Sequence, residues 1–137
     1  MDYAKPLPQI DNWNRPFWDG AKRHELLFPR CADCGHAFLP PGPVCPKCQS
    51  SSLDWQQASG KATVESWVVF HQNYFKGFKD DVPYNVCMVR LDEGPMLMIN
   101  VTGIDNASIS RGMEVEVHFR DATDTITIPL FRPAGVA

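Results

Sequence analysis

Four of the five cysteines in this sequence lie between residues 31 and 48, where they form two Cys-x-x-Cys pairs. The pairs are Cys31–Cys34 and Cys45–Cys48, and ten residues separate them. Four thiolates at this spacing can surround one tetrahedral metal ion, a geometry that Zn²⁺ accepts without penalty. A rubredoxin-like iron site uses similar ligands, so the spacing alone leaves both metals open. We predict a tetrathiolate site and favour zinc.

A shell of four cysteines favours a structural role for the metal. A catalytic zinc keeps one coordination position for water or substrate, and four thiolates leave none. A thioredoxin-like redox pair would place one Cys-x-x-Cys at the start of a helix in an α/β fold. Here two pairs lie among turn and strand signals, and His36 beside the first pair is expected to be a surface residue or a neighbour of the ligands.

No catalytic residue is predicted elsewhere in the chain. The fifth cysteine, Cys87, lies in the apolar run YNVCMV and is interpreted as a small buried side chain. A nucleophilic cysteine would need a nearby histidine and some exposure, and the sequence indicates neither. The P-loop, Gly-x-Ser-x-Gly, His-Glu-x-x-His and GxGxxG motifs are missing from the sequence.

Two aromatic segments are candidate surfaces for a ligand or a partner. In the first, DNWNRPFWDGAKRHEL, Trp13, Phe17 and Ala21 recur at four-residue spacing and predict a short helix, with Trp18 beside them. A helix this aromatic is typical of a partner-facing patch if it is exposed. The alternative is that its rings pack on the chain's own fold.

The second candidate surface is the loop FHQNYFKGFKDDVPY, residues 70–84, which interleaves aromatic side chains with lysines. Its aromatic faces could stack on an adenine ring, and its lysines could contact phosphates. Folding of the loop back onto its own domain is the alternative interpretation. The candidate residues of this loop are His71, Tyr74, Phe75, Lys76, Phe78 and Lys79.

The elements that position these residues are predicted to be mainly β. From residue 60 onward, five runs with strand periodicity are separated by turn signals, including a hairpin at 92–94. GMEVEVHFR alternates strictly, and TDTITIPLF is expected to place Ile126, Ile128 and Leu130 on one face. A short helix or turn is expected in IDNASISR. Five short strands favour a small OB-like barrel, because closure removes exposed strand edges.

The expected organisation has three parts. Residues 1–25 form an extended segment and a helix, residues 26–58 form a ribbon too small for its own core and organised by the metal, and residues 59–137 form the barrel. The fold class is therefore a short N-terminal helix, a zinc ribbon and a five-stranded OB-fold barrel.

Charge and hydropathy narrow the function classes. The 13 basic residues face 16 acidic ones, for a net charge of −3, and no Lys/Arg run occurs, which disfavours nucleic acid as a partner. The N-terminus lacks a signal-peptide pattern, and no apolar run approaches the roughly 20 residues of a membrane span. We expect a cytoplasmic protein, in which reduced thiols favour a metal over disulfides.

The order of these features resembles the bacterial and archaeal family of zinc-ribbon plus OB-fold proteins, long catalogued as a domain of unknown function. The resemblance covers nearly the whole chain and rests on RPFWDGAKRHELLFPRCADCGHAFLPPGPVCPKCQS, SGKATVESWVVFH, PYNVCMVRLDEG and GMEVEVHF. The Cys-x-x-Cys-Gly and Cys-Pro-x-Cys pairs with an intervening Pro-Pro form a specific combination. The resemblance implies a rubredoxin-like ribbon with a structural zinc.

The resemblance also implies a function. Such proteins form hetero-oligomers with thiolase-like enzymes, aldolases or acyltransferases that act on acyl-CoA, and they help to bind the CoA thioester while the partner supplies the catalytic residues. The chain would then be a non-catalytic subunit. A nucleic-acid-binding module and a stand-alone enzyme or iron carrier are the alternatives. The expected CoA- or partner-binding residues are Trp13, Phe17, Trp18, His71, Tyr74, Phe75, Lys76, Phe78 and Lys79.

Overall fold

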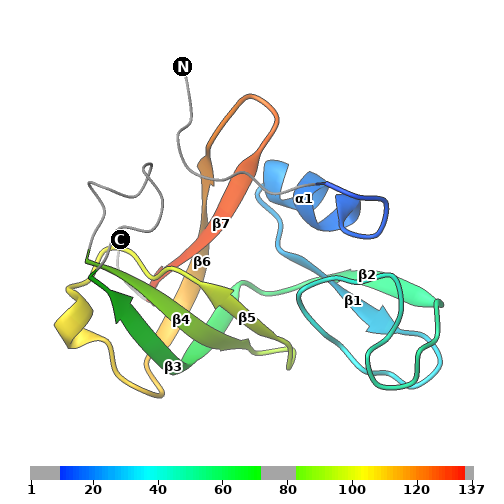
Figure 1. The fold of residues 1–137 in the computed structure, drawn as a ribbon, viewed down its shortest axis with the longest axis horizontal. Coiled ribbons are helices and arrows are strands. Elements are labelled where there is room, and N and C mark those ends of the chain that lie inside the picture. The colour runs from blue at the N-terminus through cyan, green and yellow to red at the C-terminus, as the bar shows by residue number, and fades with distance from the viewer. Residues whose placement is uncertain (1–9, 72–82, 135–137) are drawn as a thin grey trace.

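The computed structural model describes residues 10–71 and 83–134. These residues form a two-stranded sheet at one end of the molecule, a curled five-stranded sheet at the other, and a short helix between them (Figure 1). The predicted fold class, a zinc ribbon followed by an OB-type barrel, is confirmed. In chain order the elements are α1 (Arg15–Lys22), β1 (Leu27–Cys31), β2 (Leu53–Gln57), β3 (Lys61–Phe70), β4 (Tyr84–Leu91), β5 (Met96–Ile99), the 3₁₀ turn η2 (Asn106–Ser108), β6 (Glu114–Asp121) and β7 (Thr127–Pro133).

Helix α1 begins and ends at residues suited to helix termini. Pro16 lies in the first turn, where its missing N–H removes no helical hydrogen bond. At the other end His24 has a φ of 63°, and the Glu25 N–H donates to the Gly20 carbonyl over 2.8 Å. This is a Schellman-type ending, with histidine in the position that glycine usually takes. Among the described helices, none has the length and apolar character that a membrane crossing requires.

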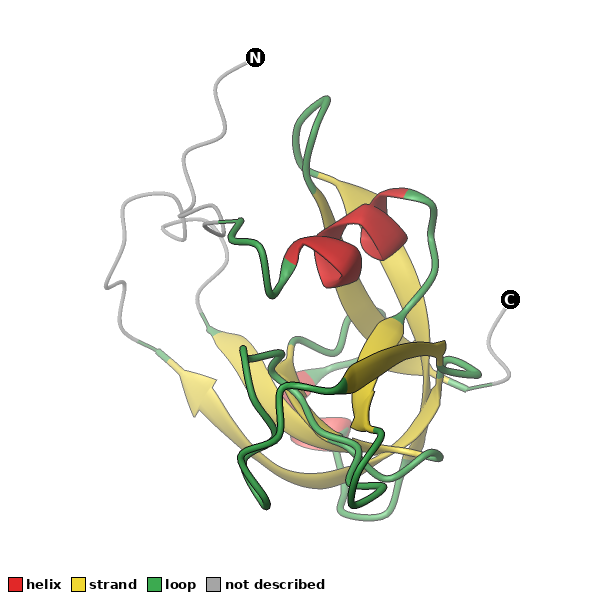
Figure 2. Cartoon of the chain, turned by 90° about the vertical axis from the view of Figure 1, so that its right-hand side faces the viewer, coloured by secondary structure: helices red, strands yellow, loops and turns green. Residues whose placement is uncertain are grey.

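The C-terminal end of α1 is fixed to the five-stranded sheet. The His24 ring stacks on Phe119 with centroids 5.1 Å apart, and its Nε2 lies 3.5 Å from Asp121 Oδ1. Figure 2 shows the helix beside the long strands, and α1 contacts both β7 and β1. The helix therefore joins the ribbon to the barrel.

The ribbon sheet pairs β1 and β2 antiparallel, from Leu27↔Gln57 to Cys31↔Leu53. At the Cys31 end of this sheet is a small cluster in which Cys31, Phe38 and Cys45 are buried and Leu53 packs against them. At the opposite end of the same sheet, Phe28 belongs to the main core of the barrel. Since two of the three buried members of the small cluster are predicted metal ligands, the ribbon has almost no apolar core of its own.

The five-stranded sheet has the order β5-β4-β3-β6-β7. Strand β3 pairs with β4 over its whole length and with β6 only from Lys61 to Thr63, with a register shift between Val64 and Ser66. A bulge of this kind bends and twists a strand. A parallel bridge between Val101 and Phe131 then brings β7 next to the segment that follows β5. The sheet thus curls toward a barrel around one core.

Strand β6 confirms the predicted alternation, because Val115 is buried and Met113, Val117 and Phe119 pack against the core from the same face. On strand β7 the apolar face expected from the sequence is not the face that reaches the main core. The expected apolar face includes Leu130, which is buried outside the main core cluster, whereas the core residue is Phe131 on the opposite face. Both faces of β7 are covered, so period-2 alternation alone could not identify the core side.

Gly60 marks the junction between ribbon and barrel. Its φ is 88°, its carbonyl accepts a 2.8 Å hydrogen bond from the Val117 N–H, and a Cβ here would lie 2.7 Å from Val117 Cγ1. The neighbouring Ser59 N–H donates to Glu93 Oε2 over 2.8 Å, which ties the junction to the β4–β5 hairpin. Any side chain at residue 60 would therefore strain the backbone and clash with Val117.

We predict that Gly60→Ala lowers the free energy of unfolding by about 2 kcal/mol or more, because left-handed backbone strain and a clash with Val117 act together. Gly103→Ala is the matched control, since Gly103 has a φ of 73° with no atom within 4 Å of its would-be Cβ. The control should cost about 1 kcal/mol, from backbone strain alone. Urea denaturation of the metal-loaded protein measures both. Equal losses would contradict the assigned clash.

Candidate metal centre and binding surfaces

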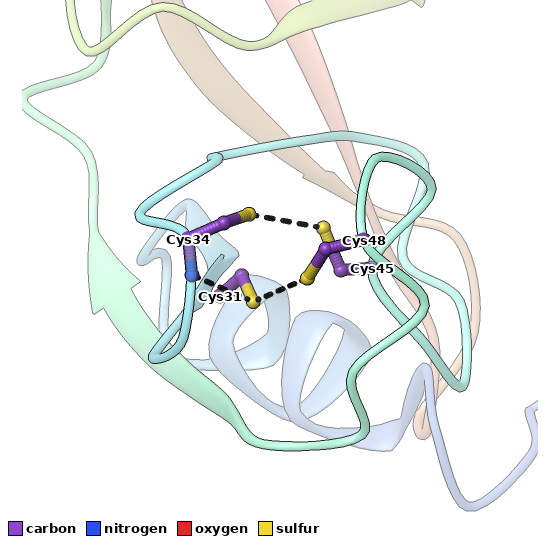
Figure 3. A group of neighbouring side chains, drawn as sticks. All are labelled: Cys31, Cys34, Cys45 and Cys48. Atoms are coloured by element: carbon purple, nitrogen blue, oxygen red, sulfur yellow. Dashed lines mark hydrogen bonds between the residues drawn. The ribbon is translucent and has the colours of Figure 1, made fainter.

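The four predicted ligands converge on one point. The Sγ atoms of Cys31, Cys34, Cys45 and Cys48 all lie within 4.8 Å of one another. Cys31 and Cys48 sulfurs are 3.5 Å apart, and Cys34 and Cys45 sulfurs are 3.6 Å apart (Figure 3). Zn–S bonds of about 2.3 Å place the corners of a tetrahedron about 3.8 Å apart. The geometry and the soft donor set therefore fit a four-coordinate zinc ion.

The two cysteine pairs sit on turns of matching construction. In the first, the Cys31 N–H donates to the His36 carbonyl over 2.8 Å, and in the second the Cys45 N–H donates to the Ser50 carbonyl over 2.8 Å. Each pair is followed directly by a left-handed residue, Gly35 with φ of 79° and Gln49 with φ of 65°. The turns place the two cysteines of each pair on the same side, facing the other pair.

Backbone amides of the turns also point at sulfur. The Cys34 N–H donates to Cys31 Sγ and the Lys47 N–H donates to Cys45 Sγ, both over 3.4 Å. The first of these bonds is the main reason why the pKa of the Cys31 thiol falls to about 7. At Cys48 a Ser50 N–H lowers the pKa, but the neighbouring Cys31 and Cys34 sulfurs outweigh it and raise the pKa to about 12. Four thiolates together therefore need a cation, which a bound metal supplies.

The other thiol is unsuited to chemistry. Cys87 is fully buried, its Sγ donates to Asn85 Oδ1 over 3.5 Å, and burial raises the pKa of the thiol. A thiol that stays protonated and out of contact with solvent is a poor nucleophile. The interpretation of Cys87 as a core residue is confirmed.

The aromatic helix divides its rings between surface and core. Trp13 is 44% exposed, whereas Phe17 is only 5% exposed and belongs to the main core. Trp18 is partly buried and meets Phe17 edge to face, with centroids 5.0 Å apart. Trp13 precedes α1, so the predicted helix is shorter at its start than expected, and Phe17 is a core residue beneath Trp18 and not a surface contact.

Beside this helix lies an apolar groove of about 360 Å³, here called the α1–β5 groove. One wall carries Asn14, Phe17 and Trp18, and the ribbon loop contributes Pro40 and Pro41. The remaining lining comes from residues 97–100 and 128–129. The groove thus lies where helix, ribbon and barrel meet.

Strand β5 forms the exposed side of this groove. Among the described residues it is an edge strand that pairs with β4 alone, and its outward side chains Met96 and Met98 are 38% and 64% exposed. Sequence reasoning did not identify this strand as an exposed apolar surface. The available signal was the run PMLMI, in which the positions that should face water are also apolar.

The second predicted surface is described only at its stems. Phe70 and Tyr84 stack with centroids 5.3 Å apart, and His71 is exposed beside a shallow pocket that Trp67 also lines. The other candidates of the loop, Tyr74, Phe75, Lys76, Phe78 and Lys79, lie outside the described residues. Their binding role remains a prediction.

Comparison with known proteins matches both parts of the chain. Residues 18–54 match the family model "ChsH2, rubredoxin-like zinc ribbon domain", and residues 55–120 match "ChsH2, C-terminal OB-fold domain". A "DUF35 domain-containing scaffold protein" of Pyrococcus furiosus is 34% identical over 83% of this chain and 79% of its own length.

Solved structures agree with this match. A chain of the "Ltp2-ChsH2(DUF35) aldolase" is 38% identical and covers 93% of this chain and 99% of its own length, with a TM-score of 0.83. A DUF35 protein of Sulfolobus solfataricus, 16% identical with a TM-score of 0.59, shares the fold.

Other relatives are longer than this chain. A "Probable enoyl-CoA hydratase alpha subunit" of Thermomonospora curvata is 38% identical over 95% of this chain, which spans 40% of that subunit. A "3-oxo-4,17-pregnadiene-20-carboxyl-CoA hydratase alpha subunit" of Mycobacterium tuberculosis is 36% identical over 79% of this chain, which spans 34% of it. The similarity is thus to less than half of each hydratase subunit.

We predict that Cys31→Ser or Cys45→Ser abolishes stoichiometric zinc binding and unfolds the ribbon, because an incomplete thiolate set holds zinc weakly and the ribbon has little core of its own. The barrel should keep its β-sheet circular dichroism. Cys87→Ser is the control, and it should retain zinc. Elemental analysis by mass spectrometry gives the metal content. Zinc that persists at the wild-type level in both ligand variants would contradict the tetrathiolate assignment.

Proposed function

Since the chain belongs to the DUF35 family, the family of the ChsH2 zinc-ribbon and OB-fold domains, we propose that it is a non-catalytic subunit of a thiolase-type enzyme complex that acts on acyl-CoA. The complex would cleave or form a carbon–carbon bond by a thiolytic or retro-aldol reaction. This chain would support assembly and CoA-thioester binding. The relatives named scaffold proteins and the chain from the Ltp2-ChsH2(DUF35) aldolase support this role.

The observation that carries the proposal is the α1–β5 groove with its exposed rim. Apolar side chains that are both exposed and grouped around a concavity mark protein interaction sites. Met98, which lines the groove, is 64% exposed, and Trp13, the sequence neighbour of the lining residue Asn14, is 44% exposed. Aromatic and methionine residues are enriched at the centres of protein interfaces, where they become desolvated on binding. We assign the groove to the partner enzyme.

The zinc site would help to shape the groove, although its cysteine ligands do not line it. Pro40 and Pro41, which line the groove, lie in the segment between the two cysteine pairs. Both ends of that segment are held by metal ligands, Cys34 and Cys45. Zinc would therefore fix one wall of the groove without taking part in the reaction, and the catalytic residues would belong to the partner.

We predict that Met98→Asp reduces co-purification with the partner enzyme at least tenfold, because a carboxylate at the groove would have to be desolvated on binding. Val44→Asp is the matched control, since Val44 is an apolar ribbon residue that is 41% exposed and does not line the groove. Affinity purification from native cells, with quantification of the thiolase-like enzyme, is the measurement. Zinc content checks that both variants are folded.

An unmodified chain that elutes alone and leaves the activity of the thiolase-like enzyme unchanged would contradict the proposed function. Equal retention by Met98→Asp and Val44→Asp would leave the subunit role intact but remove the groove as the docking site.

The loop at 70–84 is proposed to contact the CoA thioester, as its aromatic and lysine residues suggest. Lys76→Gln and Lys79→Gln are then predicted to raise the KM of the complex for acyl-CoA severalfold with little change in kcat, because a phosphate contact far from the reacting atoms contributes uniform binding. Lys47→Gln in the ribbon serves as the control for loss of one positive charge. Steady-state kinetics of the assembled complex test this, and unchanged KM values would overturn the assignment.

A further inference from the structure

We propose that a second, polar pocket of the barrel binds an anionic group, phosphate or carboxylate, of a small ligand, with Arg120 as its charged contact. The pocket has a volume of about 230 Å³ and lies between the start of β4, the segment that follows β5, and strands β6 and β7. We call it the asparagine pocket, because Asn85, Asn100 and Asn106 all line it. It is distinct in lining from the α1–β5 groove except for Asn100, and its proposed role does not rest on the proposed function.

Hydrogen bonds of the asparagine side chains hold the walls of the asparagine pocket in place. Asn85 is 6% exposed, and its Nδ2 donates to the Val101 carbonyl over 2.7 Å and to Asn106 Oδ1 over 3.0 Å. Its Oδ1 accepts a 2.8 Å hydrogen bond from the Val101 N–H. Asn100 Nδ2 donates to the Asn85 carbonyl over 2.5 Å. A polar concavity that is rigid before the ligand arrives avoids the entropy cost of ordering it on binding.

The charge in the pocket comes from Arg120. In the described part of the chain, the guanidiniums of Arg90 and Arg132 are paired with Glu65 and Glu116, whereas the guanidinium of Arg120 has no hydrogen bond or ion pair. Its side chain lines the pocket. Guanidinium groups bind carboxylate and phosphate through paired, charge-assisted hydrogen bonds. An unpaired arginine at the opening of a polar pocket therefore fits an anionic ligand.

The histidine beside the pocket does not compete with Arg120 as a cation. Burial, together with the positive charges of Arg132 and Arg120, lowers the pKa of His118 on the same face of β6. The His118 Nε2 lies 2.7 Å from Thr102 Oγ1, which also lines the pocket. A histidine in this position stays neutral near neutral pH, so Arg120 remains the cation that faces the ligand. The volume exceeds that of a single anion, which leaves room for the polar body that carries it.

The test is isothermal titration calorimetry of the full, zinc-loaded chain at low ionic strength with three probes: pyrophosphate, ADP and succinate. We expect saturable binding of at least one probe. Arg120→Gln should weaken it about tenfold or more, the scale of a lost hydrogen bond to a charged group. Arg111→Gln, which removes the same charge from an exposed turn outside the pocket, should leave it unchanged, and Arg120→Lys should restore part of the affinity.

The probes distinguish the sources of the anion. Binding of pyrophosphate or ADP identifies a phosphate site, and a preference for ADP adds a nucleoside to it, whereas binding of succinate alone identifies a carboxylate site. Chemical-shift changes at Thr102 and Asn106 would locate the ligand. The proposal is overturned if no probe binds saturably, or if Arg120→Gln and Arg111→Gln weaken binding equally. Neither result depends on the presence of a partner enzyme, so failure here is distinct from failure of the subunit role.

Discussion

The mutual repulsion of four closely spaced sulfurs is the constraint on which the rest of this structure depends. Only a cation lets all four carry negative charge within 4.8 Å, and the ribbon has little else to hold it together. Once the ribbon is fixed, Phe28 can enter the barrel core and the loop carrying Pro40 can form a wall of the α1–β5 groove. The shape of the α1–β5 groove would thus depend on the metal, although the metal ligands do not line the groove.

The sequence predicts those parts of the fold that local chemistry determines. Cysteine spacing specifies the metal site because ligand geometry is set within each turn, and the strict alternation around Val115 specifies the inner face of β6. The sequence does not specify which face of β7 packs into the core, because segments distant in sequence bury both Phe131 and Leu130. The α1–β5 groove and the asparagine pocket were missed for the same reason. Each is lined by segments that only the folded chain brings together.

The two proposed binding surfaces, the α1–β5 groove and the asparagine pocket, differ in chemistry as well as in position. The groove beside α1 is apolar and is lined by Trp18 and by exposed Met98, which suits a protein surface. The asparagine pocket is polar and carries Arg120, which suits a small anion. With 16 acidic residues against 13 basic ones, the chain as a whole lacks the charge excess typical of nucleic-acid binders. One fold can therefore offer two surfaces of different chemistry, one proposed for a partner enzyme and one for a small anion.

The edge strand β5 separates the side chains that support the fold from those that face outward. Its inward side chains, Leu97 and Ile99, pack against the core, while Met96 and Met98 point outward. Methionine side chains are unbranched and adapt to irregular shapes. Substitutions at the two outward positions would remodel the contact surface at little cost to stability, since surface changes outside special features usually have small effects. If the groove is the docking site, residues for partner recognition and residues for folding alternate along one strand, and the partner could change while the fold is kept.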